Sequence, residues 1–216
     1  PEAFLAKSVI VCEGASEVGL ARGLDQYWVG QGATSFFALG GAYVDVGGSN
    51  PDRCFVRGTA LLRLGYRVLV LVDADKPLTP EIAATFHAAG GQSLSWRVGR
   101  ALEDELFCSL GEDAIDALLA KACEAVGRDL VSAHITSKSN GQRTLESVEI
   151  GRLLEGYTDA TRGLLGTASR IRGSGWFKSV STYQEVARDI VGPNLATAEA
   201  AFQAIVEQLR TWIHAA

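Results

Sequence analysis

The sequence lacks the features that mark membrane, secreted and zinc-binding proteins. No apolar run approaches the ~18 residues of a membrane span, and the N-terminus has neither the charged start nor the long apolar stretch of a signal peptide. Its four cysteines, Cys12, Cys54, Cys108 and Cys123, fall at no metal-ligand spacing. We therefore expect a reduced, cytoplasmic protein with no membrane partner.

Methionine is absent altogether, and the first residue is Pro1. Because an intact cytosolic protein normally starts with Met, we expect a fragment or an excised domain of something longer. The 216 residues are 47% hydrophobic and 21% charged, which excludes disorder and allows one substantial domain with a subdomain. A net charge of −5 disfavours nucleic-acid binding at first sight. An acidic cluster that holds divalent cations would still meet phosphate through the metal.

Short apolar runs alternate with helical patterns in the first hundred residues. The runs cover residues 7–12, 34–39, 67–72 and 93–98, and the helical patterns cover residues 16–28, 52–64 and 80–89. Such alternation predicts βαβ units, and hence an α/β fold with a parallel sheet of about four strands flanked by helices.

Strand patterns stop after Leu102. Helices are predicted over residues 106–127, 145–157 and 194–214, with loops at 137–141 and 169–175. We therefore expect an α/β core over residues 1–107 and a mainly helical subdomain over 108–170. Residues 171–216 would return to the core and pack on it through the last helix.

Acidic residues follow three of the four predicted strands. They are Glu13 and Glu17 after the first, Asp73 and Asp75 after the third, and Glu103 and Asp104 after the fourth. Ligands of open α/β sheets collect at this carboxyl edge. Carboxylates this close would repel one another unless a cation neutralised them, and hard oxygen ligands select Mg²⁺, Mn²⁺ or Ca²⁺. The pattern predicts a divalent-metal site with one or two ions.

Each of these residues also has an ordinary structural interpretation. Asp75 alone could be a helix N-cap, Glu17 a partner of the helix dipole, and residues 103–105 a solvated helix start. Only their convergence at one edge favours a metal site. A dinucleotide site is excluded because Val18 and Leu20 stand where its glycines belong, and the chain has no Walker lysine motif.

Three strand-end motifs resemble the Toprim domain, the metal-binding α/β module of topoisomerases, bacterial primases and related nucleases. They are Glu13-Gly14, the double glycine Gly40-Gly41 and Asp73-Ala74-Asp75. The string at residues 11–17 is similar to the variant found in OLD-family nucleases (overcoming lysogenization defect). Residues 102–107 and 175–178 also resemble that family's pattern.

The resemblance implies a divalent-metal-dependent DNA endonuclease or exonuclease that uses two Mg²⁺ or Mn²⁺ ions, with Ca²⁺ binding without supporting turnover. The expected ligands are Glu13, Glu17, Asp73 and Asp75 first, Glu103 and Asp104 second, and Glu146 and Glu149 third. Glu13 would double as general base, and Lys178 would stabilise charge in the transition state.

Other residues receive supporting roles. Gly14, Gly40 and Gly41 would let the backbone approach the site closely. Lys138, Arg170 and Arg172 would contact the DNA backbone, although solvated loop charges explain them as well.

In the OLD family this module follows an N-terminal ABC-type ATPase half. Some members act beside a UvrD-like helicase in anti-phage defence, and we expect a homo-oligomer in the full-length protein.

Other functions stay open at this point. A Toprim topoisomerase normally needs a catalytic tyrosine, and none of the five tyrosines has a supporting motif. A primase would need template-binding and nucleotide-binding partners. A non-catalytic Toprim scaffold would have lost acidic ligands that this chain retains. A receiver domain would carry an acidic pair where this chain has Glu13-Gly14.

Overall fold

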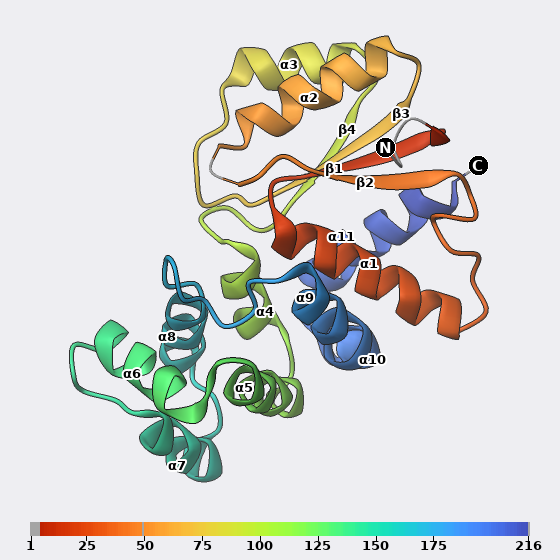
Figure 1. The fold of residues 1–216 in the computed structure, drawn as a ribbon. Helices are drawn as coiled ribbons and strands as arrows, with labels where there is room; N and C mark the ends of the chain where they lie inside the picture. The colour runs from red at the N-terminus through yellow and green to blue at the C-terminus, as the bar shows by residue number, and fades with distance from the viewer. Residues whose placement is uncertain (1–4, 49, 216) are drawn as a thin grey trace.

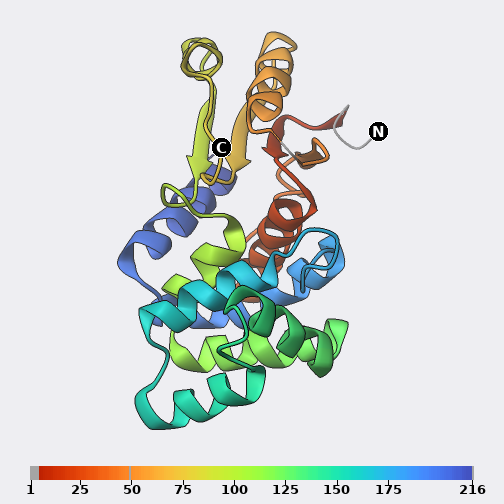
Figure 2. The ribbon, with the colours of Figure 1, turned by 90° about the vertical axis from the view of Figure 1, so that its left-hand side faces the viewer.

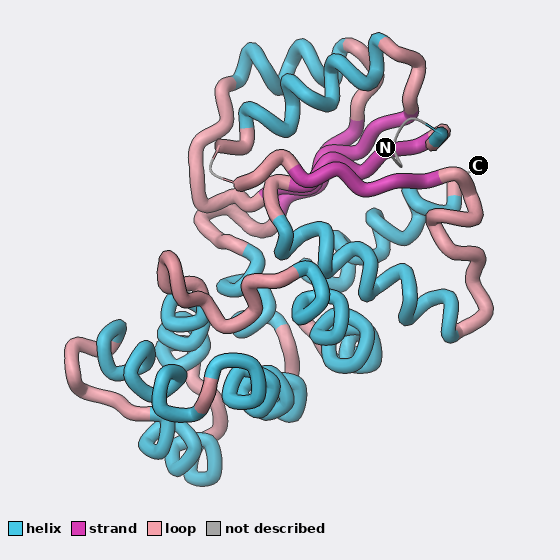
Figure 3. Tube along the Cα trace, in the orientation of Figure 1, coloured by secondary structure: helices cyan, strands magenta, loops and turns pink. Residues whose placement is uncertain are grey.

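The computed structural model describes residues 5–48 and 50–215 and confirms the α/β class. Its sheet has four parallel strands in the order β2-β1-β3-β4. The strands are β1 (Ser8–Cys12), β2 (Gly41–Asp45), β3 (Arg67–Val72) and β4 (Gln92–Ser95). Figure 3 shows the four strands side by side, with helices on both sides.

Helices make up most of the remaining described chain. They are α1 (Ala15–Gly30), α2 (Asp52–Arg63), α3 (Pro80–Ala88), α4 (Leu102–Ser109), α5 (Glu112–Val126), α6 (Arg128–Lys138), α7 (Leu145–Glu155), α8 (Asp159–Ser169), α9 (Val180–Val186), η2 (Ala187–Val191), α10 (Gly192–Asn194), η3 (Leu195–Thr197) and α11 (Ala200–His214). None of the helices within residues 5–48 and 50–215 is long and apolar enough to cross a membrane.

Alternate side chains of the buried strands face two separate helical layers. Val9 and Val70 pack with Phe55 of α2 and Phe86 of α3 on one face. Ile10 and its neighbours in β3 pack against α1 and α11 on the other face. Figure 1 shows α2 and α3 above the sheet and α1 and α11 below it. Because both faces are covered, the central strands are continuous apolar runs, as the sequence shows.

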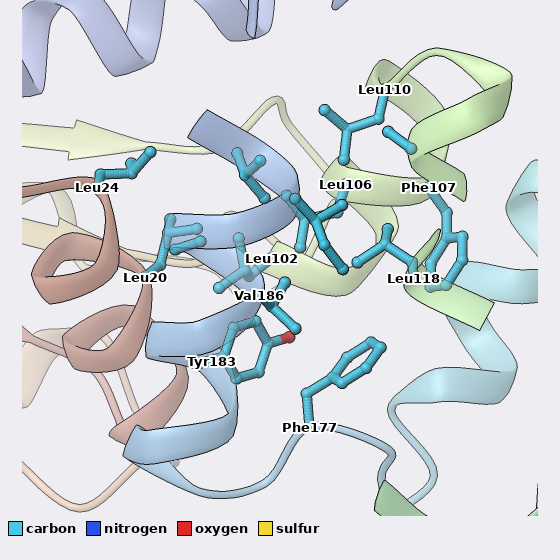
Figure 4. Packing of buried hydrophobic residues seen from close by; sticks show 14 of the residues in the cluster. Leu20, Leu24, Leu102, Leu106, Phe107, Leu110, Leu118, Phe177, Tyr183 and Val186 are labelled. Carbon is cyan, nitrogen blue, oxygen red and sulfur yellow. The ribbon is translucent and has the colours of Figure 1, made fainter. Parts of the chain in front are cut away.

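The second half of the chain forms a helical region beside this sandwich. Figure 2 shows helices α4 to α8 extending away from the strands. The apolar core runs without interruption from the sheet into this region, where Leu106 and Leu118 pack with Phe177 and Tyr183 (Figure 4). Helices α4 and α9 therefore join the two regions, and they bring their side chains close to the carboxyl end of the sheet.

The strand predicted over residues 34–39 is wrong. This segment is a turn, and β2 begins only at Gly41. The Phe36 side chain is buried and its N–H donates to the Asp25 carboxylate, whereas Phe37 is 79% exposed. Phe36 alone therefore packs into the core, from a turn, and the strand was predicted because both residues are apolar.

Helix boundaries also differ from the prediction. The helix expected over 106–127 is two helices, α4 and α5, that are separated at Leu110 and Gly111. The last helix, expected from residue 194, begins at Ala200 after two short turns. Helices α6 and α8 were not predicted, and the predicted loop at 137–141 begins inside the end of α6.

Two glycines on α1 let α9 and η2 pack directly against its backbone. A Cβ added at Gly19 would lie 2.4 Å from the Tyr183 Cβ, and one added at Gly23 would lie 2.2 Å from the Gln184 carbonyl oxygen. Real Cβ atoms do not approach other atoms so closely, so only glycine fits at either position. This packing fixes α9 beside the helix that carries Glu17.

We expect Gly23→Ala to destabilise the fold by about 1–3 kcal/mol, because the added methyl group forces α1 and η2 apart. Gly30→Ala is the matched control in the same helix, since a Cβ there meets nothing within 4 Å. It should be neutral or stabilise by up to about 1 kcal/mol through helix propensity. Urea unfolding followed by circular dichroism measures both, and equal effects would contradict the close packing.

Candidate functional site

Glu13 lies directly after β1 and is nearly fully buried. Its backbone is fixed on two sides: the Glu13 N–H donates to the Leu71 carbonyl at 3.2 Å, and the Glu13 carbonyl accepts from the Gly48 N–H at 2.6 Å. Its Oε1 accepts a hydrogen bond from Lys76 Nζ at 3.0 Å. Its Oε2 is buried and has no hydrogen-bond partner among the described residues.

Glu17 occupies the first turn of α1 and is also buried. Its Oε2 accepts a hydrogen bond from the Gly14 N–H at 2.9 Å. The carboxylate therefore folds back over the strand-to-helix turn and caps the start of α1. The interpretation of Glu17 as a helix-start partner holds, and it leaves the carboxylate beside the end of the sheet.

Asp73 and Asp75 follow β3, the neighbour of β1. Asp73 Oδ1 accepts a hydrogen bond from the Leu102 N–H at 2.9 Å, which ties the strand end to the start of α4. Asp75 Oδ2 lies 3.4 Å from a guanidinium nitrogen of Arg170. Asp75 Oδ1 is buried without a hydrogen-bond partner in the described part of the chain.

The three acidic residues at the start of α4 have different surroundings. Asp104 accepts from the Ala101 N–H at 3.0 Å and pairs with Arg170, also at 3.0 Å. Glu105 is fully buried between Arg97 and Arg100, so it anchors the helix. The Glu103 carboxylate is the one whose charge acts on Asp73 and Glu17.

The electrostatics place several of these carboxylates in one cluster. Burial, together with the charges of Glu103, Glu13 and Asp75, raises the pKa of Asp73 to about 8. Burial also raises the pKa of Glu17 well above its ordinary value, with further contributions from Asp73, Glu103 and Glu13. Mutual repulsion of this kind requires short separations in a poorly solvated site. We call Glu13, Glu17, Asp73, Asp75 and Glu103 the acidic cluster.

The donor set of the acidic cluster fits a hard divalent cation. All its members offer carboxylate oxygens, and two of those oxygens, one each from Glu13 and Asp75, are buried and have no hydrogen-bond partner among the described residues. As the side chains stand, no group of three or more His, Cys, Asp or Glu residues within the described ranges is arranged to hold a metal ion. A divalent ion at this place would therefore require side chains of the acidic cluster to rotate.

Lys76 and the four basic residues predicted for the site divide into two groups. Lys76 and Arg170 reach into the acidic cluster, where they pair with Glu13 and with Asp75 and Asp104. Arg170, predicted to contact DNA, is thus committed to carboxylates. Lys138, Arg172 and Lys178 are exposed, and among the described residues none of the three forms an ion pair or a side-chain hydrogen bond.

Lys178 follows two buried aromatic residues. The ring of Trp176 packs edge-on against Phe107 of α4, and its indole N–H donates to His134 Nδ1 at 3.1 Å. Phe177 packs against Tyr183 of α9. The segment is therefore firmly anchored, and its lysine lies at the surface between the helical region and α9.

Two groups of predicted site residues lie elsewhere. Gly40 precedes β2 and Gly41 is its first residue, paired with Ser8 at the start of β1, so their expected approach to the site is wrong. The misplaced strand explains this error. Glu149 pairs with Arg128 in the helical region, close to Glu146.

Other glycines take the expected place. Gly47 and Gly48 follow β2 with φ of 83° and 74°, a conformation that favours glycine. The Gly48 N–H bonds the Glu13 carbonyl, and its Cα lies 3.9 Å from a Cβ built on Gly14. The loop after β2, and not the glycines at its start, therefore approaches the acidic cluster.

Sequence reasoning missed two residues of the site. Lys76 directly follows the Asp73-Ala74-Asp75 motif, and that position was the available signal. Tyr183 is fully buried, and the nearby charges of Glu103, Glu17 and Asp73 add to the effect of burial in raising its pKa. Its hydroxyl lies beside the Glu103 carboxylate, and a side-chain hydrogen bond between the two contributes to this shift of the pKa. No pattern in the sequence distinguishes this tyrosine from a core residue.

A comparison with known protein families finds no matching family, and a comparison with curated proteins finds no matching relative. Among solved structures, the chain is similar to the C-terminal region of the OLD protein of Xanthomonas campestris pv. campestris. The two are 16% identical with a TM-score of 0.42, over 97% of this chain and 99% of the other. The Toprim assignment itself stays a prediction.

Proposed function

We propose that the chain is a divalent-metal-dependent DNA nuclease whose active site is the acidic cluster at the carboxyl edge of the sheet. The observation that supports this most directly is the crowding of five carboxylates, with two buried oxygens that have no partner in the described structure. Leaving buried acceptors unpaired is costly, and a bound cation satisfies them.

The position of each acidic residue determines the role that we assign to it. Glu13, Asp73 and Asp75 stand at adjacent strand ends, so they would hold the ions, with Glu17 and Glu103 completing the set from two helix starts. Asp104, already bonded to Ala101 and Arg170, would hold α4 in place. Divalent ions bound here would lower the pKa of water and neutralise charge on the phosphate.

Proton transfer and charge stabilisation remain for the protein. Glu13 Oε2, which is buried and has no hydrogen-bond partner in the described structure, would accept a proton from the attacking water. Lys178, on its anchored segment, would stabilise charge on the phosphate. Lys138 and Arg172, both exposed, would contact the DNA backbone without reading its sequence. The ATPase half, the helicase and the homo-oligomer stay predictions from the family resemblance.

Incubation with supercoiled plasmid tests the proposal. We expect nicking or linearisation with Mg²⁺ or Mn²⁺, and no cleavage with Ca²⁺ or with chelator. Circular dichroism of the same sample verifies that the protein is folded. A folded chain that binds Mn²⁺ but cuts neither supercoiled nor single-stranded DNA would contradict the nuclease. A chain that binds no divalent ion would contradict the metal site itself.

A further inference from the structure

A lysine occupies one carboxylate oxygen of the acidic cluster. Lys76 Nζ lies 3.0 Å from Glu13 Oε1, and its side chain is 42% exposed while that of Glu13 is 6% exposed. The ammonium thus bonds the buried carboxylate from the solvent side. Lys76 directly follows the Asp73-Ala74-Asp75 motif. No other basic residue lies within two positions of Asp75 in the sequence.

Arg170 has a comparable position but a different geometry. Its guanidinium bridges Asp75 and Asp104, which belong to different elements, at 3.4 and 3.0 Å. A planar group that bonds two carboxylates at once is held in place more firmly than an ammonium with one bond. Lys76, which hydrogen-bonds one carboxylate among the described residues and has a flexible stem, is therefore the cation that can leave more readily.

The same Glu13 carboxylate has one oxygen bonded to Lys76 and the other without a described partner. A divalent ion that binds Glu13 competes with the ammonium for this carboxylate and is repelled by its charge. We propose that Lys76 is a built-in counter-cation: it neutralises Glu13 in the metal-free protein and releases it when a divalent ion binds. This inference rests on the proposed function, because it assumes a metal at the acidic cluster.

Competition makes a prediction that a purely structural ion pair does not. Removal of the ammonium should tighten metal binding while it weakens the metal-free fold. If the lysine only held the ligands in position, its removal would lower both the affinity for the metal and the stability of the metal-free protein. The two readouts therefore separate the interpretations.

The experiment compares Lys76→Met with wild type by titration calorimetry with Mn²⁺ and by thermal unfolding with chelator. Lys7→Met is the matched control, since Lys7 is exposed and lies before β1 at the opposite end of the strand. We expect Lys76→Met to lower the Kd for Mn²⁺ roughly threefold to tenfold and to lower the metal-free Tm by about 2 °C. Lys7→Met should change neither quantity.

The outcomes distinguish the two levels of the proposal. If wild type binds Mn²⁺ and Lys76→Met binds it with equal or weaker affinity, the proposed role of Lys76 as a counter-cation is wrong, whereas the proposed metal site is retained. If wild type binds no Mn²⁺, both the counter-cation and the proposed nuclease site fall. Tighter binding with an unchanged metal-free Tm would also overturn the counter-cation, because the ammonium would then not neutralise Glu13.

Discussion

Glu13→Gln is expected to reduce metal-dependent plasmid cleavage by roughly 10³-fold, which is the scale on which general bases contribute to catalysis. The substitution keeps the size of the side chain and removes the negative charge that a cation requires. Glu13 is buried beside other carboxylates, so its neutralisation relieves repulsion within the metal-free site. We therefore expect the variant to fold. The relief of repulsion should offset the loss of the ion pair with Lys76, so the Tm of the metal-free variant should be no lower than that of wild type.

The measurement is an initial rate of nicking under saturating Mn²⁺, with Glu124→Gln as control. Glu124 is exposed on α5 and, in the described part of the chain, forms an ion pair with Lys121 alone, so its neutralisation should leave cleavage within twofold of wild type. Retention of more than a tenth of the wild-type rate by Glu13→Gln would show that Glu13 is neither an essential ligand nor the base. Equal losses in both variants would point to a general effect of charge.

The sequence was sufficient to predict the strands on which the site depends. The run at 67–72 matches β3, and that at 7–12 begins one residue before β1, because strands buried on both faces must be apolar throughout. Carboxylates that follow adjacent parallel strands then lie near one another by topology alone. Glu13, Asp73 and Asp75 could be predicted on that basis.

The remainder of the site depends on contacts between distant segments. Phe36 and Phe37 read as strand because they are apolar, yet the Asp25 carboxylate holds Phe36 in a turn. Arg170 reads as a loop charge, but folding of α8 brings it to Asp75 and Asp104. Neither partner choice is encoded by local spacing, so only the three-dimensional structure could identify it.

The acidic cluster should also couple metal binding to pH. Asp73 has a pKa of about 8, raised by burial and then by Glu103, Glu13 and Asp75, so near neutral pH its carboxyl group binds a proton in the metal-free protein. A divalent ion must displace that proton. Displacement of the Asp73 proton alone should raise the affinity for Mn²⁺ roughly tenfold for each pH unit between pH 6 and 8, and the raised pKa of Glu17 should add to this rise.

The stability of the metal-free protein should follow the opposite course. In the unfolded chain Asp73 loses its proton near pH 4, whereas in the folded protein it keeps the proton until about pH 8. The folded state therefore binds more protons in this window, and its stability falls as the pH rises from about 4 to about 8. Thermal unfolding with chelator at pH 5, 6, 7 and 8 should show a falling Tm, and saturating Mn²⁺ should reduce the fall. Asp73→Asn, which cannot ionise, should make the metal-free profile less steep, with the remaining slope due to Glu17, and should weaken Mn²⁺ binding at every pH. An affinity for Mn²⁺ that is the same at pH 6 and pH 8 would show that no buried proton is displaced, and the acidic cluster would then not be where the ion binds.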